Sequence, residues 1–426
     1  MNDILYWIWL SASCVPGSES FSKLIKKFSS PLEIYKADES EISACIGSAR
    51  SQEYLSLTDK SLEKAKEILS FCLTKKVGIL TYSDPNYPDL LKEIKNPPVL
   101  LFYRGVLPDF NNNFFISVVG TRKISEYGRK NTFTISHDLA KAGAVIVSGM
   151  AIGIDGVALA GALSANKPTV AVIGSGIDVC YPMVHKRLAQ EIVKSGCVLT
   201  EYLPGTKPLK YNFPNRNRII SALSPITLVM EGNERSGALI TARLAKEQGR
   251  AVYAFPGNVG NSNSQAGNLL IKNGAILFTS ADDIIRDFEF KSAGKLNPFN
   301  LSDNNNINMF EVFRKLEVSC VCSSDNIFKA PKPKKKAENQ TPISNTLSEE
   351  ENTINSSSLH IEGMIEDTFD KLTLKLYKKI PVGKECLIES LADDEIPLPK
   401  VMQMLLKLEI KKFITMLPGD RVKRIL

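Results

Sequence analysis

Between residues 77 and 288 the sequence alternates short apolar runs, rich in β-branched residues, with amphipathic stretches long enough to form helices. The apolar runs are Phe114–Val119, Ala144–Ser148, Thr169–Ile173, Val198–Thr200, Thr227–Met230 and Ala251–Phe255. Continuous apolar strands separated by helices are typical of a parallel sheet that is covered on both faces. Residues 77–288 are therefore predicted to form an α/β core with an extended, Rossmann-like, mostly parallel sheet.

The preceding segment, residues 1–76, is predicted to form a small helical domain of the SAM or helix-hairpin-helix kind. The run Val15-Pro16-Gly17 has the composition of a turn between two helices. Four apolar residues fall on one face of the second helix: Phe21, Leu24, Ile25 and Phe28. Such a turn binds a backbone phosphate in helix-hairpin-helix modules, whereas a plain helical cap packed on the core explains the same pattern.

Residues 289–365 are predicted to be a polar linker. Low-complexity runs mark it, namely Asn304–Asn306, Lys334–Lys336, Glu349–Glu351 and Ser356–Ser358. One short helix is expected within the linker, from Met309 to Leu316. The lysine run could attract nucleic acid weakly, but a solvated tether explains it as well.

Periodicity returns in residues 366–426, which are predicted to form a winged-helix-like domain. Four apolar residues lie on one helical face: Val401, Met404, Leu405 and Leu408. A β-rich stretch at 412–416, the turn Pro418-Gly419-Asp420 and the basic run 421–424 follow. Helices followed by a small hairpin resemble a winged helix, a module that binds DNA or other proteins. The basic run favours DNA slightly.

Composition excludes several classes of protein. The chain has 426 residues, a net charge of +7 and eight cysteines, none in a CxxC pair. With only three distant histidines, no zinc site can be assembled from neighbours, and neither a metal nor a cofactor is predicted. The apolar run 4–10 is too short to cross a bilayer and lacks a preceding basic residue. We expect a cytoplasmic protein with no membrane contact.

Glycine-containing loops follow three of the predicted strands. They are Gly120-Thr121-Arg122, the run 148–155 beginning Ser148-Gly149, and the run 174–178 beginning Gly174-Ser175-Gly176. The carboxyl ends of parallel strands meet at one edge of a sheet, where ligands bind. Backbone amides and a guanidinium fork there are suited to phosphate. The three loops therefore predict one crevice for a phosphate-bearing ligand.

The loops lack the motifs of known nucleotide enzymes. The run Gly174-x-Gly176 is only a fragment of GxGxxG, and neither GxxxxGK[ST] nor GxSxG occurs. Asp155 and Asp178 are the carboxylates placed in the loops. They could act in acid–base chemistry, but aspartates in turns more often cap backbone amides. No catalytic residue is predicted.

Read in order, these loops resemble successive blocks of the DprA/Smf family of DNA-processing proteins. Further matching blocks are Tyr181-Pro182, Thr200–Gly205, Phe213–Ile220, Arg235–Ala242 and Phe255-Pro256-Gly257, with Tyr87–Leu91 and Pro97–Leu100 upstream. The resemblance covers about half of the chain, from Tyr82 to Asp283. It implies a non-catalytic, cytoplasmic protein that binds single-stranded DNA, forms a homodimer and helps to load RecA recombinase. It also implies protection of incoming DNA in bacteria that undergo transformation.

The resemblance also implies which residues bind DNA. Arg122 would grip a phosphate with the amides of Gly120 and Thr121, and Lys186 would hold a neighbouring phosphate. Either arginine of the Phe-Pro-x-Arg-Asn-Arg block could extend this basic rim, or could instead brace a loop by pairing with Glu201 or Glu231. The predicted DNA-binding set is Gly120, Thr121, Arg122, Ser148, Gly149, Gly174, Gly176, Lys186, Arg216 and Arg218.

Three positions depart from the family pattern. Leu159 stands where a histidine is usual, His185 stands where asparagine is common, and Thr200 replaces a frequent serine. The loss of a histidine at 159 weakens any inference of a small-molecule pocket but leaves phosphate binding untouched.

Two other functions remain open. A nucleotide-processing phosphoribohydrolase has a similar architecture, but the PGGxGT motif of those enzymes is absent from the loop between Glu231 and Gly237. A protein adaptor acting through the winged helix and the linker is the third interpretation. Removing the chain from about residue 289 onward would separate it from the DNA-binding interpretation.

Overall fold

The computed structural model describes residues 2–47, 51–288, 295–297 and 307–319. Further along the chain it describes 371–381, 386–393, 396, 401, 404–405, 408–409, 413–417 and 421–424. The chain divides into two compact units, Met1–Ala330 and Pro331–Leu426. None of the helices in these ranges is long and apolar enough to cross a bilayer. The same ranges contain no cluster of His, Cys, Asp and Glu that could hold a metal ion.

A nine-stranded sheet forms the centre of the first unit, with the order β1-β2-β6-β5-β4-β3-β7-β8-β9. The strands are β1 (Gly78–Thr81), β2 (Leu100–Gly105), β3 (Phe114–Val119), β4 (Ala144–Ser148), β5 (Thr169–Val172), β6 (Cys197–Thr200), β7 (Ile226–Val229), β8 (Ala251–Ala254) and β9 (Ile276–Leu277). The pairs β1–β2 and β2–β6 are antiparallel, and the other pairs are parallel. The six predicted strands are confirmed to within one residue at each end, and the Rossmann-like fold class is confirmed.

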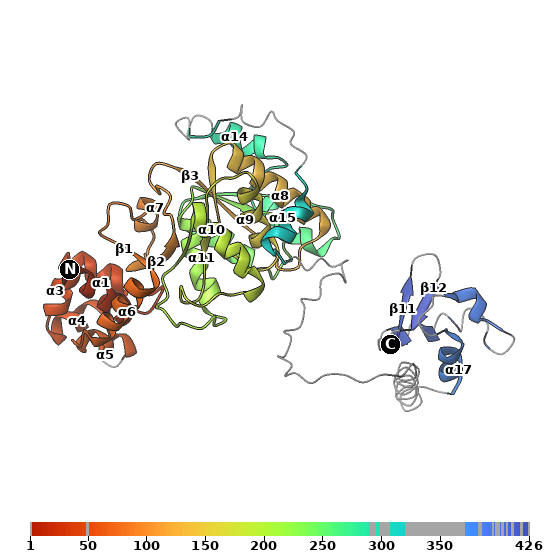
Figure 1. The fold of residues 1–426 in the computed structure, drawn as a ribbon, viewed down its shortest axis with the longest axis horizontal. Coiled ribbons are helices and arrows are strands. Elements are labelled where there is room, and N and C mark those ends of the chain that lie inside the picture. Colours follow the sequence, from red (N-terminus) through yellow and green to blue (C-terminus); the bar gives the residue numbers. More distant parts are fainter. Residues whose placement is uncertain are drawn as a thin grey trace, which may run out of the picture. The chain divides into compact units, whose positions relative to one another are not determined.

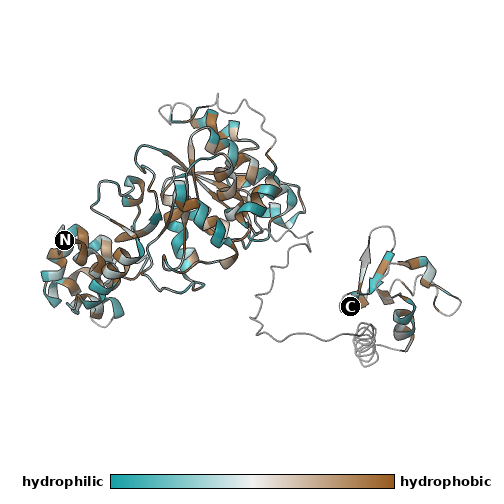
Figure 2. Ribbon diagram, in the orientation of Figure 1, coloured by the Kyte–Doolittle hydropathy of each residue, from teal (hydrophilic) through white to brown (hydrophobic). Residues whose placement is uncertain are grey.

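Helices cover both faces of this sheet, as Figure 1 shows. They are α7 (Asp89–Lys92), α8 (Glu126–Lys141), α9 (Ile154–Ser164), α10 (Lys186–Ser195), α11 (Asn212–Ala222), α12 (Gly237–Glu247), α13 (Gln265–Lys272) and α14 (Ala281–Phe288). Side chains alternate between the two faces of β3. Ile116 and Val118 belong to the core that includes α8, α9 and α10, whereas Phe115 and Val119 belong to the core that includes α11 and α12. In Figure 2 hydrophobic residues accordingly gather on the strands.

Six helices precede the sheet: α1 (Asn2–Ser13), α2 (Ser20–Phe28), α3 (Pro31–Lys36), α4 (Glu39–Ile46), α5 (Gln52–Thr58) and α6 (Glu63–Lys75). The predicted turn separates α1 from α2, with Gly17 at a φ of +82°. It is docked on the α/β core, because the side-chain amide of Asn215 donates to Pro16 O at 2.5 Å and that of Asn96 donates to Gly17 O at 2.7 Å. This docking favours the plain helical cap over a phosphate-binding hairpin.

The helix expected inside the linker is confirmed as α15 (Met309–Leu316). It packs on the α/β core, with the ring of Phe313 perpendicular to that of Phe133 at 5.5 Å. Just after it, the amide of Ser319 donates to Nε2 of His185 at 3.1 Å. The low-complexity runs that predicted the linker lie outside the described residues.

The second unit contains α17 (Lys371–Lys379) and an antiparallel sheet of β10 (Cys386–Leu387), β12 (Arg421–Arg424) and β11 (Ile414–Leu417), in that order. The four apolar residues predicted to share a helical face are all buried in its core, together with Leu376 and Ile380. This composition agrees with a winged helix. The expected turn 418–420 lies outside the described part of the chain.

Candidate nucleic-acid interface

The sheet topology places a crevice at the carboxyl ends of the parallel strands. From β3 the chain proceeds through β4, β5 and β6 toward one side of the sheet, and from β7 through β8 and β9 toward the other. The strand order therefore reverses between β3 and β7, which pair in register from Ile116–Ile226 to Val119–Val229. In open α/β sheets, ligands bind outside the strand ends near such a reversal.

A small cleft lies at this edge. Its lining residues come from the loops after β3, β4 and β5 and from the first turn of α11: Arg122, Gly149, Ala151, Ile152, Gly174, Tyr181, Pro182 and Phe213. The structure thus brings together residues of all three predicted glycine loops. Among the described residues, the amides of Gly149 and Gly174 make no hydrogen bond.

One cation and two aromatic rings stand close together in the cleft. The exposed guanidinium of Arg122 lies 5.4 Å from the centre of the Phe213 ring. The Phe213 ring in turn lies 5.4 Å from the Tyr181 ring, at an interplanar angle of 40°. Sequence reasoning missed Tyr181 and Phe213 as site residues, although both stand in blocks that carry the family resemblance. The aromatic residue before proline in each block was the available signal.

Lys186 adjoins the cleft without lining it. It is exposed, and it begins α10. Burial raises the pKa of the Cys180 thiol, and the Lys186 ammonium opposes that rise. Lys186 follows Tyr181 and Pro182, which line the cleft, by five and four residues. That Arg122 and Lys186 hold neighbouring phosphates remains a prediction.

The two loop aspartates cap turns. Asp178 Oδ1 accepts from the amide of Gly205 at 2.8 Å, and Asp155 Oδ2 accepts from the amide of Ala151 at 3.4 Å. Burial raises the pKa of Asp155, while the guanidinium of Arg216 opposes the rise. The sequence left open whether these carboxylates act in acid–base chemistry or cap backbone amides in turns. In the structure they cap backbone amides.

Arg216 does not reach solvent, which corrects the expectation that it extends the basic rim. Its Nη1 donates to Gly149 O at 2.9 Å and also to Val172 O. Burial lowers its pKa to about 10. A Cβ on Gly149 would lie 2.6 Å from Arg216 Nη2, so glycine is required where the guanidinium packs. Arg216 supports the cleft from beneath the strand ends.

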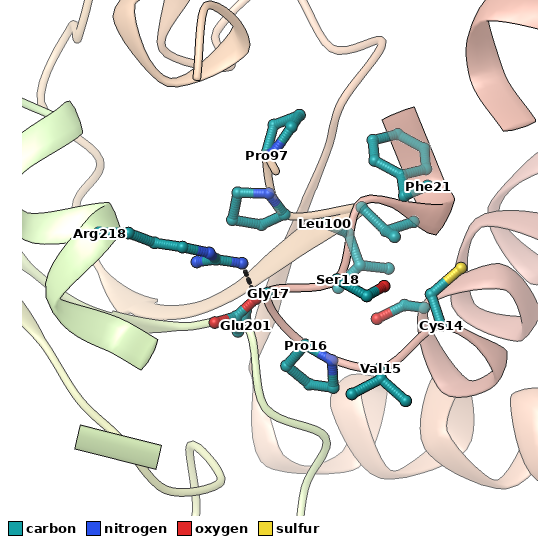
Figure 3. Close-up of a pocket in the computed structure, with 13 residues that line it drawn as sticks. Cys14, Val15, Pro16, Gly17, Ser18, Phe21, Pro97, Leu100, Glu201 and Arg218 are labelled. Carbon is teal, nitrogen blue, oxygen red and sulfur yellow. Dashed lines mark hydrogen bonds and ion pairs between the residues drawn. The ribbon is translucent and has the colours of Figure 1, made fainter. Parts of the chain in front are cut away.

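Arg218 is likewise buried, and the alternative of pairing with Glu201 is the one observed. Its Nη2 lies 2.5 Å from Glu201 Oε2, and the two side chains are 3% and 5% exposed. Figure 3 shows the pair at a pocket that is lined on its other side by the α1–α2 turn. A phosphate cannot reach Arg218 without displacing this turn. The expected DNA contact is therefore replaced by an internal brace.

Several other predicted contacts are occupied within the protein. The amide of Thr121 donates to Glu231 O at 2.8 Å, and that of Gly176 donates to Thr206 O at 2.9 Å. The hydroxyl of Ser148 donates to Val118 O at 2.6 Å. A Cβ on Gly120 would lie 2.4 Å from Ile154 Cγ1, so this glycine serves close packing. The amides of Thr121 and Gly176 and the hydroxyl of Ser148 are therefore occupied, whereas the amide of Gly120, like those of Gly149 and Gly174, makes no hydrogen bond within the described part of the chain.

Leu159, His185 and Thr200, which depart from the family pattern, are all buried. Leu159 is fully buried in α9. His185 donates from Nδ1 to Met150 O at 2.9 Å and accepts the Ser319 amide at Nε2. Both histidine contacts lie within the protein, and none of the three residues lines the cleft.

Comparisons with known proteins agree with this architecture. The family model described as "DNA recombination-mediator protein A" matches residues 78–289. DNA processing protein DprA of Streptococcus pneumoniae is 41% identical over 259 residues, which cover 61% of this chain and 88% of that protein. DNA processing protein DprA of Bacillus subtilis is 37% identical over 236 residues, covering 55% and 80%. The X-ray structure of the Streptococcus pneumoniae protein matches with a TM-score of 0.58 and 36% identity, over 66% of this chain and 96% of that one.

Proposed function

The chain belongs to the DNA recombination-mediator protein A family, which includes the proteins named DprA and Smf, and from that premise we propose that it binds single-stranded DNA in the cleft. The observation that carries the proposal is the meeting of three strand-end loops around Arg122, where the amides of Gly149 and Gly174 make no hydrogen bond within the described part of the chain. Such amides and a guanidinium are suited to phosphate. Lys186 supplies the second charge at the rim.

Affinity is expected to come mainly from phosphates, with little sequence preference. The Arg122→Ala, Lys186→Ala double variant should lose binding to an oligo-dT probe while remaining folded. If each side chain neutralises one phosphate, the slope of log K against log salt should fall by about 1.4, at roughly 0.7 per phosphate on a single strand. Gel shifts across a salt series measure both quantities.

A matched control removes two charges elsewhere. Arg243 on α12 and Lys272 on α13 are exposed and do not line the cleft. Their double alanine variant should bind oligo-dT as the wild type does. Unchanged affinity in the Arg122, Lys186 double variant would refute the proposal. An equal loss of affinity in the control variant would show that only the net charge of the protein matters, and not the cleft. A duplex of the same sequence should bind more weakly than the single strand.

We infer that the protein acts by binding rather than by catalysis. Asp155 and Asp178 cap turns, and the carboxylate of Glu231 accepts from the backbone amide and the hydroxyl of Ser125 at 2.9 and 2.5 Å. Each of these carboxylates accepts a hydrogen bond within the protein, and none of the three lines the cleft. Incubation with AMP should release no base above background; turnover would favour the phosphoribohydrolase alternative.

The family description supports two partners. A recombination mediator acts on a recombinase, so we propose that the bound strand is passed to RecA in the cytoplasm, during transformation or recombination. RecA filaments should form faster on single-stranded DNA in the presence of this protein.

A homodimer is proposed from the family resemblance and from β9, an edge strand whose Ile276 and Leu277 are exposed. Sedimentation equilibrium tests the dimer.

A further inference from the structure

We propose that His185 is a positioning residue for DNA binding: its uncharged ring fastens the segment after α15 to the loop 148–155, and this contact keeps the cleft in its binding shape. The inference rests on the proposed binding of single-stranded DNA and adds to it a support that lies outside the cleft and depends on one proton. His185 itself is fully buried and does not line the cleft.

The His185 ring joins two segments that are far apart in the sequence. Its Nδ1 donates to Met150 O at 2.9 Å, and its Nε2 accepts from the amide of Ser319 at 3.1 Å. The ring is closely packed, since a Cβ on Gly156 would lie 2.6 Å from His185 Cε1. Only the neutral tautomer with its hydrogen on Nδ1 makes both hydrogen bonds.

The loop on one side of the ring shapes the cleft. Met150 is buried with a φ of +58°, a left-handed conformation that a side chain keeps only where its surroundings hold it. It follows Gly149, which lines the cleft. Further along the loop, a Cβ on Gly153 would lie 2.8 Å from Arg122 O. A shift of this loop therefore moves Gly149 and the backbone that carries the Arg122 guanidinium.

The segment on the other side of the ring reaches the same loop. Besides its hydrogen bond to His185, Ser319 accepts from the amide of Gly153 at 3.4 Å. The segment is anchored upstream by α15, which packs on the α/β core. Ser319 is thus connected through Gly153 to the backbone of Arg122, and the segment supports the cleft from outside it.

A second proton on the ring would break one of its two hydrogen bonds and keep the other. Nδ1 would still donate to Met150 O, whereas Nε2 would carry a hydrogen and could no longer accept the Ser319 amide. Two buried donors would then face each other without an acceptor. Burial lowers the pKa of His185, so the ring is uncharged at neutral pH and the contact is made.

Charged side chains on the elements around the ring do not offset this proton. Glu317, two residues before Ser319, lies 3.6 Å from Arg187. Asp155 in α9 caps the loop by accepting a backbone amide, and Lys186 is exposed. Burial and two backbone hydrogen bonds are what act on the pKa of the ring, so no described carboxylate stabilises its charged form.

Two substitutions of one residue test the contact in the full-length protein, with oligo-dT binding followed by fluorescence anisotropy near neutral pH. Ser319→Pro removes the amide hydrogen, whereas Ser319→Ala keeps it and is the matched control. Ser319→Pro should bind about 2- to 10-fold more weakly than the wild type, the factor that corresponds to one hydrogen bond. Ser319→Ala should bind as the wild type does, and equal affinity of the two variants overturns the inference.

The dependence on pH identifies the ring. The protein gains positive charge as the pH falls from about 7.5 to about 5, which by itself strengthens binding to phosphates. Wild-type affinity should instead fall below about pH 6.5, as the ring begins to take up its second proton. The amide of His185→Asn can still donate to Met150 O but does not titrate. This variant should bind at neutral pH as weakly as Ser319→Pro and show no further fall.

His137 provides the control for the pH profile. It lies half-buried on α8, with Nδ1 2.9 Å from the hydroxyl of Ser164. His137→Asn should keep the wild-type fall in affinity. A wild-type affinity that does not fall, or a fall that persists in His185→Asn, overturns the role of the His185 ring.

Hydrogen exchange tests the coupling from the other side. Because coupling between two sites is reciprocal, saturating oligo-dT should slow amide exchange in the peptide that contains Ser319, and unchanged exchange overturns the inference. The proposed function fails in a different way, namely if the wild type does not bind oligo-dT near neutral pH. If the Arg122, Lys186 double variant loses binding while Ser319→Pro does not, only the inference about His185 is overturned.

Discussion

Replacing Glu201 with leucine is expected to destabilise the first unit severely, because it leaves Arg218 charged and buried without its partner. The two side chains are 3% and 5% exposed, and they are joined through Nη2 and Oε2. Arg218 Nε and Nη1 are already buried without a hydrogen-bond partner in the described structure. Removing one partner of a buried ion pair costs about 3–5 kcal/mol, and Glu201 is the acidic residue with which Arg218 forms an ion pair among the described residues.

Replacing Arg218 instead of Glu201 should lower the free energy of unfolding by less. Burial already raises the pKa of Glu201, and Arg218 opposes that rise. Without Arg218 the carboxyl group can take up a proton, so the loss is that of an unsatisfied neutral group, about 1–3 kcal/mol. Arg218→Met should therefore be milder than Glu201→Leu. The double variant should recover most of the stability, since an apolar pair often replaces a buried ion pair without loss.

Urea unfolding can measure this cycle. The two tryptophans, Trp7 and Trp9, lie in α1, whose following turn lines the pocket at the ion pair (Figure 3). Their fluorescence should report the loss of the helical cap and its packing. A cost below about 1 kcal/mol for Glu201→Leu, or a double variant as unstable as the sum of the two single variants, would refute the reasoning. Folded Arg218→Met should bind oligo-dT as the wild type does.

Three further outcomes are expected. Gly149→Ala should lower both the melting temperature and the affinity for oligo-dT, because the new Cβ would lie 2.6 Å from two buried polar side-chain atoms; Gly237→Ala, where nothing lies within 4 Å, is the matched control. His185 is buried with a lowered pKa, and its neutral ring accepts a backbone amide. The stability that His185 contributes should therefore be complete above its unfolded pKa of about 6.5, and it should decline as the pH falls from there toward the lowered pKa of the folded protein. His185→Asn should flatten the melting temperature over this pH range, as measured by thermal melts. A chain truncated after residue 330 should still bind oligo-dT in gel shifts, and this result would make an adaptor role secondary. A chain truncated after residue 288 also lacks α15, so its melting temperature should be lower.

The strands of the parallel sheet could be read from the sequence because they are buried on both faces and appear as continuous apolar runs. Three strands were not predicted. β1 begins with glycine and has four residues, β2 pairs antiparallel with both of its neighbours, and β9 has only two residues. Neither β1 nor β2 is part of the strand–helix alternation on which the prediction rested, and β9 is too short to appear as an apolar run. Which short apolar segment joins a sheet edge depends on partners that lie far away in the sequence.

The sequence alone was sufficient to locate the strand-end loops and to predict that they share a crevice, since both follow from the local pattern and from the geometry of parallel strands. It could not tell which arginines face that crevice. Arg122 and Arg218 look alike in the sequence, yet one lies open over Phe213 and the other is covered by the α1–α2 turn, some 200 positions away. Burial, and with it the choice between binding a phosphate and bracing a loop, is decided by what packs on a side chain from elsewhere in the chain. Only the tertiary structure contains that information.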